Sequence, residues 1–278
     1  MSFFKKKHPI DYDTFIGITD DYMFCTVMED VDKCKEFLQR VLKIEIKSIK
    51  VISSQKHIRN RKGSHGIRLD VYVTDYANNT YDIEMQTTFQ KDLAKRTRYY
   101  HSEMDGYLIR KGENYSKLGR NIVIFVCTFD FFNENKSIYT FRNTCKESSN
   151  LLLDDGLETI ILNIHGNRED IDESLSNVLD YMKTGTPNDD YTQSIADSVS
   201  TLNNDNDWRD RQMTIGMKLY DKYLEGLEEG ESIGLEQSLQ IINLYSQGVP
   251  VAKIAKRLSI KSKTVKNYIV QYKSIIQQ

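Results

Sequence analysis

The spacing of apolar residues divides the first part of the chain into helices and strands. Residues 21–42 carry apolar side chains at helical intervals, with a polar break in the middle, and predict two helices. Residues 44–53 alternate as a strand, and residues 93–111 predict a helix that ends at Gly112. Further strands are predicted at 121–129, 138–143 and 157–164. This order of elements predicts an α/β fold, in which helices flank a mixed central sheet.

A β-hairpin is predicted between these elements, in the segment IRLDVYVTDYANNTYDIEMQ, which alternates on both sides of a polar turn at 77–79. Asp70 and Glu84 have the parity opposite to the apolar residues. If the turn centres near Ala77, the two carboxylates lie directly opposite each other on neighbouring strands. The apolar parity is shared by Leu69, Val71, Val73, Tyr81, Ile83 and Met85.

Two carboxylates in this position repel each other, and a cation between them relieves the repulsion. Mg²⁺ and Mn²⁺ prefer oxygen ligands of this kind, and the peptide carbonyl of Met85 is a third candidate ligand. A bound ion of this type activates water for phosphodiester hydrolysis. The alternative is that Asp70 and Glu84 are a surface pair on a solvated face of the sheet.

Composition and charge add an appendage to this picture. The chain has 278 residues, 39% of them hydrophobic, and a net charge of −2, which predicts one large domain with appendages and no particular partner. The segment 249–278 nevertheless carries seven basic residues and no acidic one. The four cysteines form no CxxC pair and are expected to be reduced thiols. Without a long apolar run or a leader-like N-terminus, we expect a cytoplasmic protein with no membrane partner.

The last hundred residues are predominantly helical in pattern. From Asp170 to about Tyr245 the pattern is helical, with a break at 185–187. Glycines recur every four residues at 226, 230 and 234 in a Glu-rich stretch, which we interpret as a weakly stable solvated helix or hinge. Self-association into a homo-oligomer through this helix is a further alternative. The predicted domains are a core at 1–168, a helical extension at 169–234 and a C-terminal segment at 235–278.

Several motifs occur in an order that resembles a known family. They are LDVYV, IEMQ, RYYHS and FVCTFD, preceded by TDDYMFCTVMED and CKEFLQRVL and followed by IYTFRNTC and LLLDDGLETIILNIHG. Together they resemble the Rpn family of recombination-promoting nucleases and transposase-like proteins, a branch of the PD-(D/E)xK nucleases, over roughly Thr19 to Met213. The resemblance implies a restriction-endonuclease-like fold, a divalent metal cofactor and DNA as the substrate.

The resemblance also implies roles for individual residues. Asp70 matches the metal-binding aspartate, and Glu84 matches the first acid of the (D/E)xK element. Gln86 stands where the lysine of that element usually stands; it can hydrogen-bond a water molecule but carries no positive charge. Asp20 or Asp21 is a candidate for an additional acidic group, and a helix N-cap explains either residue equally well.

The missing positive charge has candidate sources in the helix that follows the hairpin. Lys95, Arg96 or Arg98 can replace the lysine, and Arg96 or Arg98 can clamp the phosphate that is cut. The alternative is a cationic helix face with one aromatic residue, Tyr100, in the core.

The C-terminal segment, in the residues GVPVAKIAKRLSIKSKTV, resembles a helix-turn-helix of the resolvase type. Its apolar positions have the spacing of a small three-helix core, and its second helix would enter the major groove of DNA. The alternative is a helical hairpin that packs on a partner or on the core. The candidate DNA-binding residues are Lys261, Ser262, Lys263, Thr264, Lys266 and Asn267.

The sequence therefore predicts a metal-dependent DNA endonuclease of a recombination or mobile-element system. Asp70 and Glu84 would hold the metal, Gln86 would position water, and Arg96 or Arg98 would contact the phosphate. Because Gln86 lacks a charge, the main alternative is a catalytically degenerate core that binds DNA through its C-terminal segment without cutting it. An RNA substrate is also compatible with these residues.

Overall fold

The computed structural model describes residues 14–59 and 66–276. The chain forms two compact units, one spanning Asp13–Arg209 and one that includes Asp210–Gln278. The first unit is built on a six-stranded sheet with the order β1-β2-β3-β4-β6-β5, in which β3, β4 and β6 are parallel and the other neighbours are antiparallel. The strands are β1 (Ile49–Ile58), β2 (Ile67–Asp75), β3 (Thr80–Gln86), β4 (Asn121–Cys127), β5 (Ile138–Phe141) and β6 (Leu157–Asn163). The predicted α/β fold with a mixed central sheet is confirmed.

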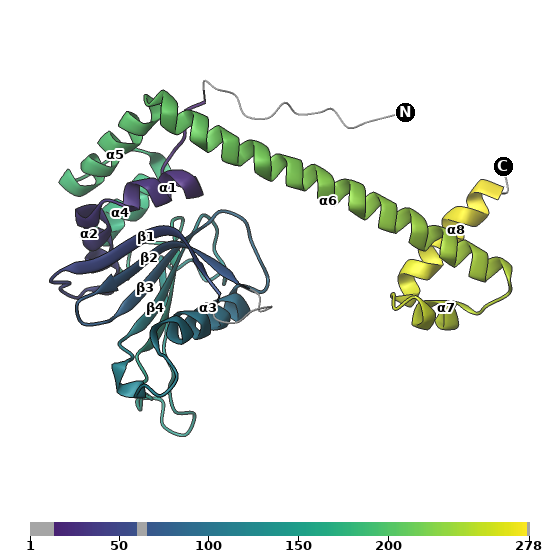
Figure 1. Cartoon of the computed structure of the whole chain (residues 1–278), viewed down its shortest axis with the longest axis horizontal. Helices are drawn as coiled ribbons and strands as arrows, with labels where there is room; N and C mark the ends of the chain where they lie inside the picture. Colours follow the sequence, from purple (N-terminus) through teal and green to yellow (C-terminus); the bar gives the residue numbers. More distant parts are fainter. Residues whose placement is uncertain (1–13, 60–65, 277–278) are drawn as a thin grey trace. The chain divides into compact units, whose positions relative to one another are not determined.

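Helices cover both faces of the sheet (Figure 1). One face is covered by α1 (Asp21–Met28), α2 (Val31–Leu42), α4 (Glu173–Thr184) and α5 (Asp190–Asn203). The opposite face is covered by α3 (Leu93–Leu108). The polar side of the hairpin is therefore buried beneath α3.

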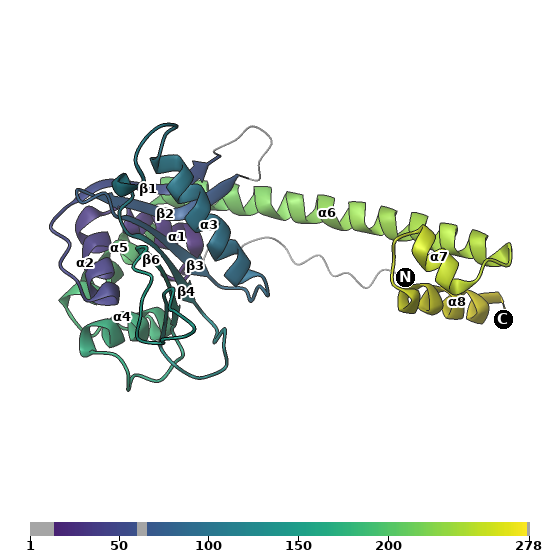
Figure 2. The same ribbon diagram turned by 90° about the horizontal axis from the view of Figure 1, so that it is seen from below.

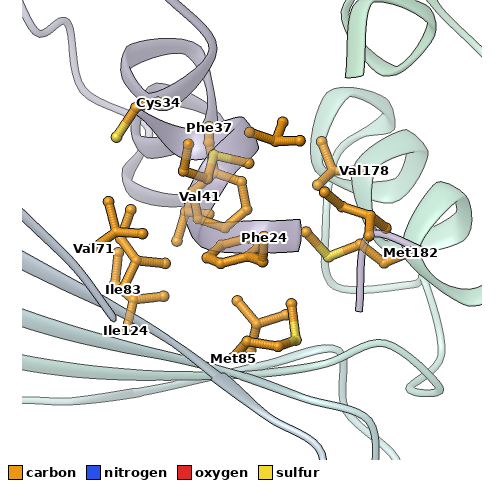
Figure 3. Packing of buried hydrophobic residues seen from close by; sticks show 14 of the residues in the cluster. Phe24, Cys34, Phe37, Val41, Val71, Ile83, Met85, Ile124, Val178 and Met182 are labelled. Carbon is orange, nitrogen blue, oxygen red and sulfur yellow. The ribbon is translucent and has the colours of Figure 1, made fainter. Parts of the chain in front are cut away.

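The larger core lies between the sheet and the first group of helices (Figure 3). Phe24 of α1 and Phe37 of α2 are fully buried, with their rings edge to face at a centroid distance of 6.1 Å. They pack between the sheet residues and Val178 and Met182 of α4. Because α4 and α5 bury their apolar faces in this core, they belong to the first unit, and its boundary falls after Arg209 instead of after the predicted residue 168.

The first strand begins later than its alternation predicts, at Ile49 instead of residue 44. Lys43 ends α2 in the left-handed conformation, with φ 55°. The chain then turns back onto α2, where the buried Ile46 donates its backbone N–H to the side-chain oxygen of Gln39 at 2.9 Å. The backbone of Ile46 is thus hydrogen-bonded to α2, and the segment before Ile49 pairs with none of the described strands.

The hairpin has the predicted register near its turn, with Val71 paired to Ile83 and Val73 to Tyr81. One apolar prediction is wrong. Leu69 packs in the cluster beneath α3, whereas Val71 packs in the larger core on the opposite face. Next to this point, Gln55 of β1 has φ 48°, so the regular pleat of the sheet is interrupted and the simple alternation of faces fails.

The second unit contains most of α6 (Asn206–Ser246), together with α7 (Val251–Arg257) and α8 (Ser262–Ile276). α7 and α8 lie beside the C-terminal end of α6 (Figure 2) around a small apolar core. This core contains Ile241, Leu244, Ile254, Ala255, Val265 and Ile269, with Leu258 and Ile260 packed against it. The predicted core of the C-terminal segment is confirmed. None of the described helices carries an apolar stretch long enough to reach across a bilayer.

Candidate active site

The hairpin brings the two predicted metal ligands, Asp70 of β2 and Glu84 of β3, into direct contact. The backbone N–H of Asp70 donates to Oε1 of Glu84 at 3.0 Å, and the N–H of Met85 donates to Oδ2 of Asp70 at 3.2 Å. The strand register ends at Val71–Ile83, and Asp70 and Glu84 are the next residue on each strand, consistent with a turn centred near Ala77. Both side chains are held by main-chain donors, which fixes their orientation.

These carboxylates are buried, because α3 covers their face of the sheet. Asp70 is 7% exposed and Glu84 is 5% exposed, which excludes a solvated surface pair. Loss of hydration raises the pKa of Asp70 to about 6, and loss of hydration together with the charge of Asp70 raises the pKa of Glu84 to about 8. Without a metal ion, the site therefore favours the protonated form of these carboxylates. A bound cation would take the place of the protons.

A third carboxylate, Asp82, lies on the same strand as Glu84 and is fully buried. Neither of its oxygens has a hydrogen-bond partner of acceptable geometry among the described residues. Burial and the charges of Glu84 and Asp70 raise the pKa of Asp82 well above the usual range of an aspartate. The sequence placed Asp82 on this face but gave no sign of its depth.

Arg96 of α3 is the cation that reaches into the site. Its Nη2 lies 3.8 Å from Oε2 of Glu84 and donates a short hydrogen bond to Oε1 of Gln86. Its guanidinium lies over the rings of Tyr100, at 5.6 Å, and Phe125, at 5.0 Å. This contact places a positive charge beside Gln86.

Two further residues define the polar contacts of the site. Gln86 donates through Nε2 to the carbonyl of Thr88 at 2.6 Å, so both ends of its amide are engaged. Arg68, which the sequence analysis did not single out, has Nη2 4.0 Å from Oδ1 of Asp70. Arg68 stands two residues before the motif aspartate, and this proximity is the signal that could have identified it.

The carboxylates open into a cleft of about 580 Å³, which Arg68 and Arg96 also line. Asp21 and Lys95 lie on its wall, whereas Asp20 is the N-cap of α1 and accepts from the N–H of Met23 at 2.9 Å. Arg98 faces a separate cleft with His101 and does not line this one. The structure thus brings Arg96, and not Arg98, to the carboxylates.

The donor set suits a hard cation with few protein ligands. Within residues 14–59 and 66–276, no group of three or more His, Cys, Asp or Glu side chains is arranged to hold a metal ion. Two adjacent carboxylates remain, each with one oxygen engaged by a backbone N–H. Magnesium is commonly bound by one or two carboxylates together with water, whereas zinc usually takes three or four protein ligands. The pair of Asp70 and Glu84 therefore suits magnesium better than zinc.

The candidate DNA-binding residues lie in the second unit, at the start of α8. They are exposed apart from Thr264, which is half-buried, and the basic residues of 249–278 are all exposed. Val265 and Ile269, on the other side of the helix, are buried in the small core. α8 therefore presents a basic face and an apolar face.

Comparison with known proteins agrees with the resemblance seen in the sequence. Residues 21–191 match the family described as PD-(D/E)XK nuclease family transposase. No curated protein and no solved structure matches the chain significantly. The matched segment covers more than half of the chain and includes the hairpin and α3, which form the cleft. The chain therefore belongs to the PD-(D/E)XK nuclease family transposases.

Proposed function

We propose that this protein is a metal-dependent endonuclease that cleaves phosphodiester bonds in DNA. The observation that supports the proposal most directly is the pair Asp70 and Glu84, desolvated and in contact at one end of a cleft, with Arg96 beside them. Keeping two buried carboxylates together costs free energy in the absence of a cation. That cost is explained if a divalent cation is the intended occupant.

In this proposal Asp70, Glu84 and the peptide carbonyl of Met85 hold Mg²⁺ or Mn²⁺. When bound, the ion polarises the scissile phosphate and lowers the pKa of the attacking water. The N–H groups of Asp70 and Met85 keep the two carboxylates oriented before the ion arrives. Such preorganisation reduces the cost of assembling the site during the reaction.

Arg96 supplies the positive charge that a lysine provides in related nucleases. Its guanidinium is held by Gln86 and by the rings of Tyr100 and Phe125, so its donors are fixed near the carboxylates. A fixed guanidinium can donate two parallel hydrogen bonds to a phosphate and stabilise the charge that develops on its oxygens. Because both ends of its own amide are engaged, Gln86 acts as a positioning residue for Arg96, in place of the predicted water ligand.

The C-terminal unit is proposed to recruit DNA. Lys261, Lys263 and Lys266 are exposed near the start of α8, where they can contact phosphates, while Thr264 and Asn267 lie closer to base edges. The second candidate function keeps this recruitment and omits cleavage. It is favoured by one observation, the neutral Gln86 at the position of the usual lysine.

The test is incubation of supercoiled plasmid with the purified full chain and Mg²⁺, Mn²⁺ or EDTA. We expect metal-dependent nicking by the wild type and loss of nicking in Asp70→Asn and Glu84→Gln, which keep size and hydrogen bonding. Glu45→Gln, at an exposed position, is the matched control and should nick normally. Retained nicking in Asp70→Asn would remove the assignment. Binding without nicking in any metal would favour the second function, and a parallel RNA substrate tests the choice of DNA.

A further inference from the structure

A row of aromatic side chains lies next to the carboxylate cleft and is not used by the proposed chemistry. We call it the aromatic ledge. Three of its rings are substantially exposed: Phe89 at 51%, Phe132 at 37% and Phe141 at 46%. Large exposed apolar side chains that gather in one place usually mark a binding surface. The ledge consists of Phe89, Phe129, Phe131, Phe132, Tyr139 and Phe141.

The rings of the ledge form a continuous chain of contacts. Phe89 meets Phe129 edge to face at 5.6 Å and stacks on Phe131 at 5.5 Å. Phe131 meets Phe132 at 4.9 Å, and Phe132 in turn contacts Phe141 at 5.4 Å. The pairs are edge-to-face, stacked or tilted, so the rings of the ledge lie in several orientations.

The ledge is held in place by a network of hydrogen bonds. The carboxylate of Asp130 accepts from the N–H of Phe132 at 3.1 Å, the N–H of Asn135 at 2.6 Å and the hydroxyl of Tyr139 at 3.0 Å. Phe131 is half-buried and packs against the cluster beneath α3. The loop therefore presents Phe132 to solvent from a fixed backbone, which is a requirement for a recognition surface that must bind without a large entropy loss.

The ledge is linked to residues of the cleft by short chain segments and hydrogen bonds. Only two residues lie between Gln86 and Phe89, a span of at most about 10 Å in an extended chain. Thr128, at the start of the ledge loop, donates its N–H to the carbonyl of Gln86 at 3.1 Å. Arg96 also reaches the side chain of Gln90, next to Phe89, at 2.5 Å. A nucleic acid that places a phosphate at Arg96 thus has the ledge within reach of its neighbouring nucleotides.

We propose that the aromatic ledge stacks unpaired bases next to the scissile phosphate, so that the preferred substrate is a single strand or a flap instead of an intact duplex. This inference rests on the proposed function, because the cleft must receive a phosphate. Base stacking on aromatic rings is tolerant of sequence, because each base has a π-face. In a duplex these faces are occupied by neighbouring bases. Phenylalanine adds no hydrogen-bonding group, so the ledge selects for strand state and not for sequence.

The experiment measures binding in EDTA, so that no cleavage is required. Fluorescence anisotropy is recorded with a single strand of about 12 nucleotides and with the corresponding duplex. All proteins are full-length and carry Lys263→Ala and Lys266→Ala, which weakens binding by the C-terminal unit. The variants are Phe89→Leu, which stays apolar but loses the aromatic face, and Phe89→Trp, which keeps it. Tyr115→Ala, at an 80% exposed ring elsewhere in the same unit, is the control.

We expect Phe89→Leu to lose about 5- to 150-fold in affinity for the single strand, as expected for one stacked base. Duplex affinity should remain unchanged, and Phe89→Trp and Tyr115→Ala should bind like the parent. Equal affinity of Phe89→Leu and the parent for the single strand would overturn the proposal. So would a change in oligomeric state on Phe89→Leu without a change in strand affinity, which would assign the ledge to self-association. If the wild type cleaves neither plasmid nor a single strand in Mg²⁺ or Mn²⁺ but the Phe89 series behaves as expected, the nuclease proposal fails while base stacking stands.

Discussion

The substitution Asp70→Asn should stabilise the metal-free protein at alkaline pH while abolishing its function. Asp70 has a pKa of about 6 in the folded chain, against about 3.9 for an unperturbed aspartate. Below about pH 4 the side chain is protonated in both the folded and the unfolded chain, and the burial of a charge costs nothing. Between about pH 4 and pH 6 the unfolded chain ionises while the folded chain keeps its proton, so stability is lost across this window and stays low above it.

The size of this loss follows from the two pKa values. Their separation corresponds to about 3 kcal/mol of unfolding free energy, lost in full well above pH 6. Asparagine removes the charge but can still accept the N–H of Met85 through its side-chain oxygen. Allowing for the cost of a buried amide, we expect Asp70→Asn to be about 1–3 kcal/mol more stable than the wild type at about pH 8.5, and close to it at about pH 4.

Urea unfolding in EDTA at the two pH values measures this difference. Asp75→Asn is the matched control, because Asp75 is as buried as Asp70 and lies at the other end of the same strand. Its carboxylate accepts from the N–H groups of Ala77 and Asn79 and from the hydroxyl of Tyr81. Asp75→Asn should therefore destabilise the protein. A destabilised Asp70→Asn at about pH 8.5 would refute the reasoning, because it would show that Asp70 is satisfied without a metal ion.

Three more outcomes are expected. Arg96→Ala should lower the rate of plasmid nicking about 100- to 1000-fold, because it removes the guanidinium beside the carboxylates, whereas Arg98→Ala, which faces another cleft, should nick normally. Saturating Mg²⁺ should raise the melting temperature of the wild type more at about pH 8.5 than at about pH 6, because protons compete with the ion for the two raised-pKa carboxylates; an equal rise would contradict this. Replacing Lys261, Lys263 and Lys266 by alanine should flatten the slope of log affinity for duplex DNA against log salt by about three, as measured by salt titration of binding.

The sequence was sufficient for the parts of the fold that depend on local patterns. The alternation on both sides of one turn determined the register of the hairpin and hence the pairing of Asp70 with Glu84. The spacing of Ile254, Val265 and Ile269 predicted the small C-terminal core in the same way. Both inferences needed only the period of a strand or a helix.

The parts that were wrong or absent depend on contacts between distant segments. The start of β1 was misplaced because Gln39 of α2 captures the backbone of Ile46. The predicted end of the core at 168 was too early because the acidic stretch after it also carries the apolar face of α4, including Val178 and Met182, which fills the larger core. Charge composition describes the solvent side of a helix and does not reveal what its other side covers.

Burial of the active-site face is the most consequential property that the hairpin alone could not reveal. Alternation shows that Asp82 and Glu84 share a face, but not that the face is covered. The signal for the cover lies in α3, where Leu93, Tyr100 and Met104 recur at helical spacing and are buried against the sheet. Only the two patterns together predict carboxylates without solvent, and hence raised pKa values.

The position of Arg96 bears on whether the site is active or degenerate. Its side chain is only 22% exposed, and its Nε lacks a partner among the described residues. Burying a charge with an unsatisfied donor costs free energy, and replacing buried ionic groups by apolar ones is often neutral or stabilising. A core that only bound DNA through another unit would gain stability by losing Arg96 together with the buried acids. The position of Arg96, held by Gln86 and two rings beside two desolvated carboxylates, therefore favours the proposed site, which must meet a cation and a phosphate.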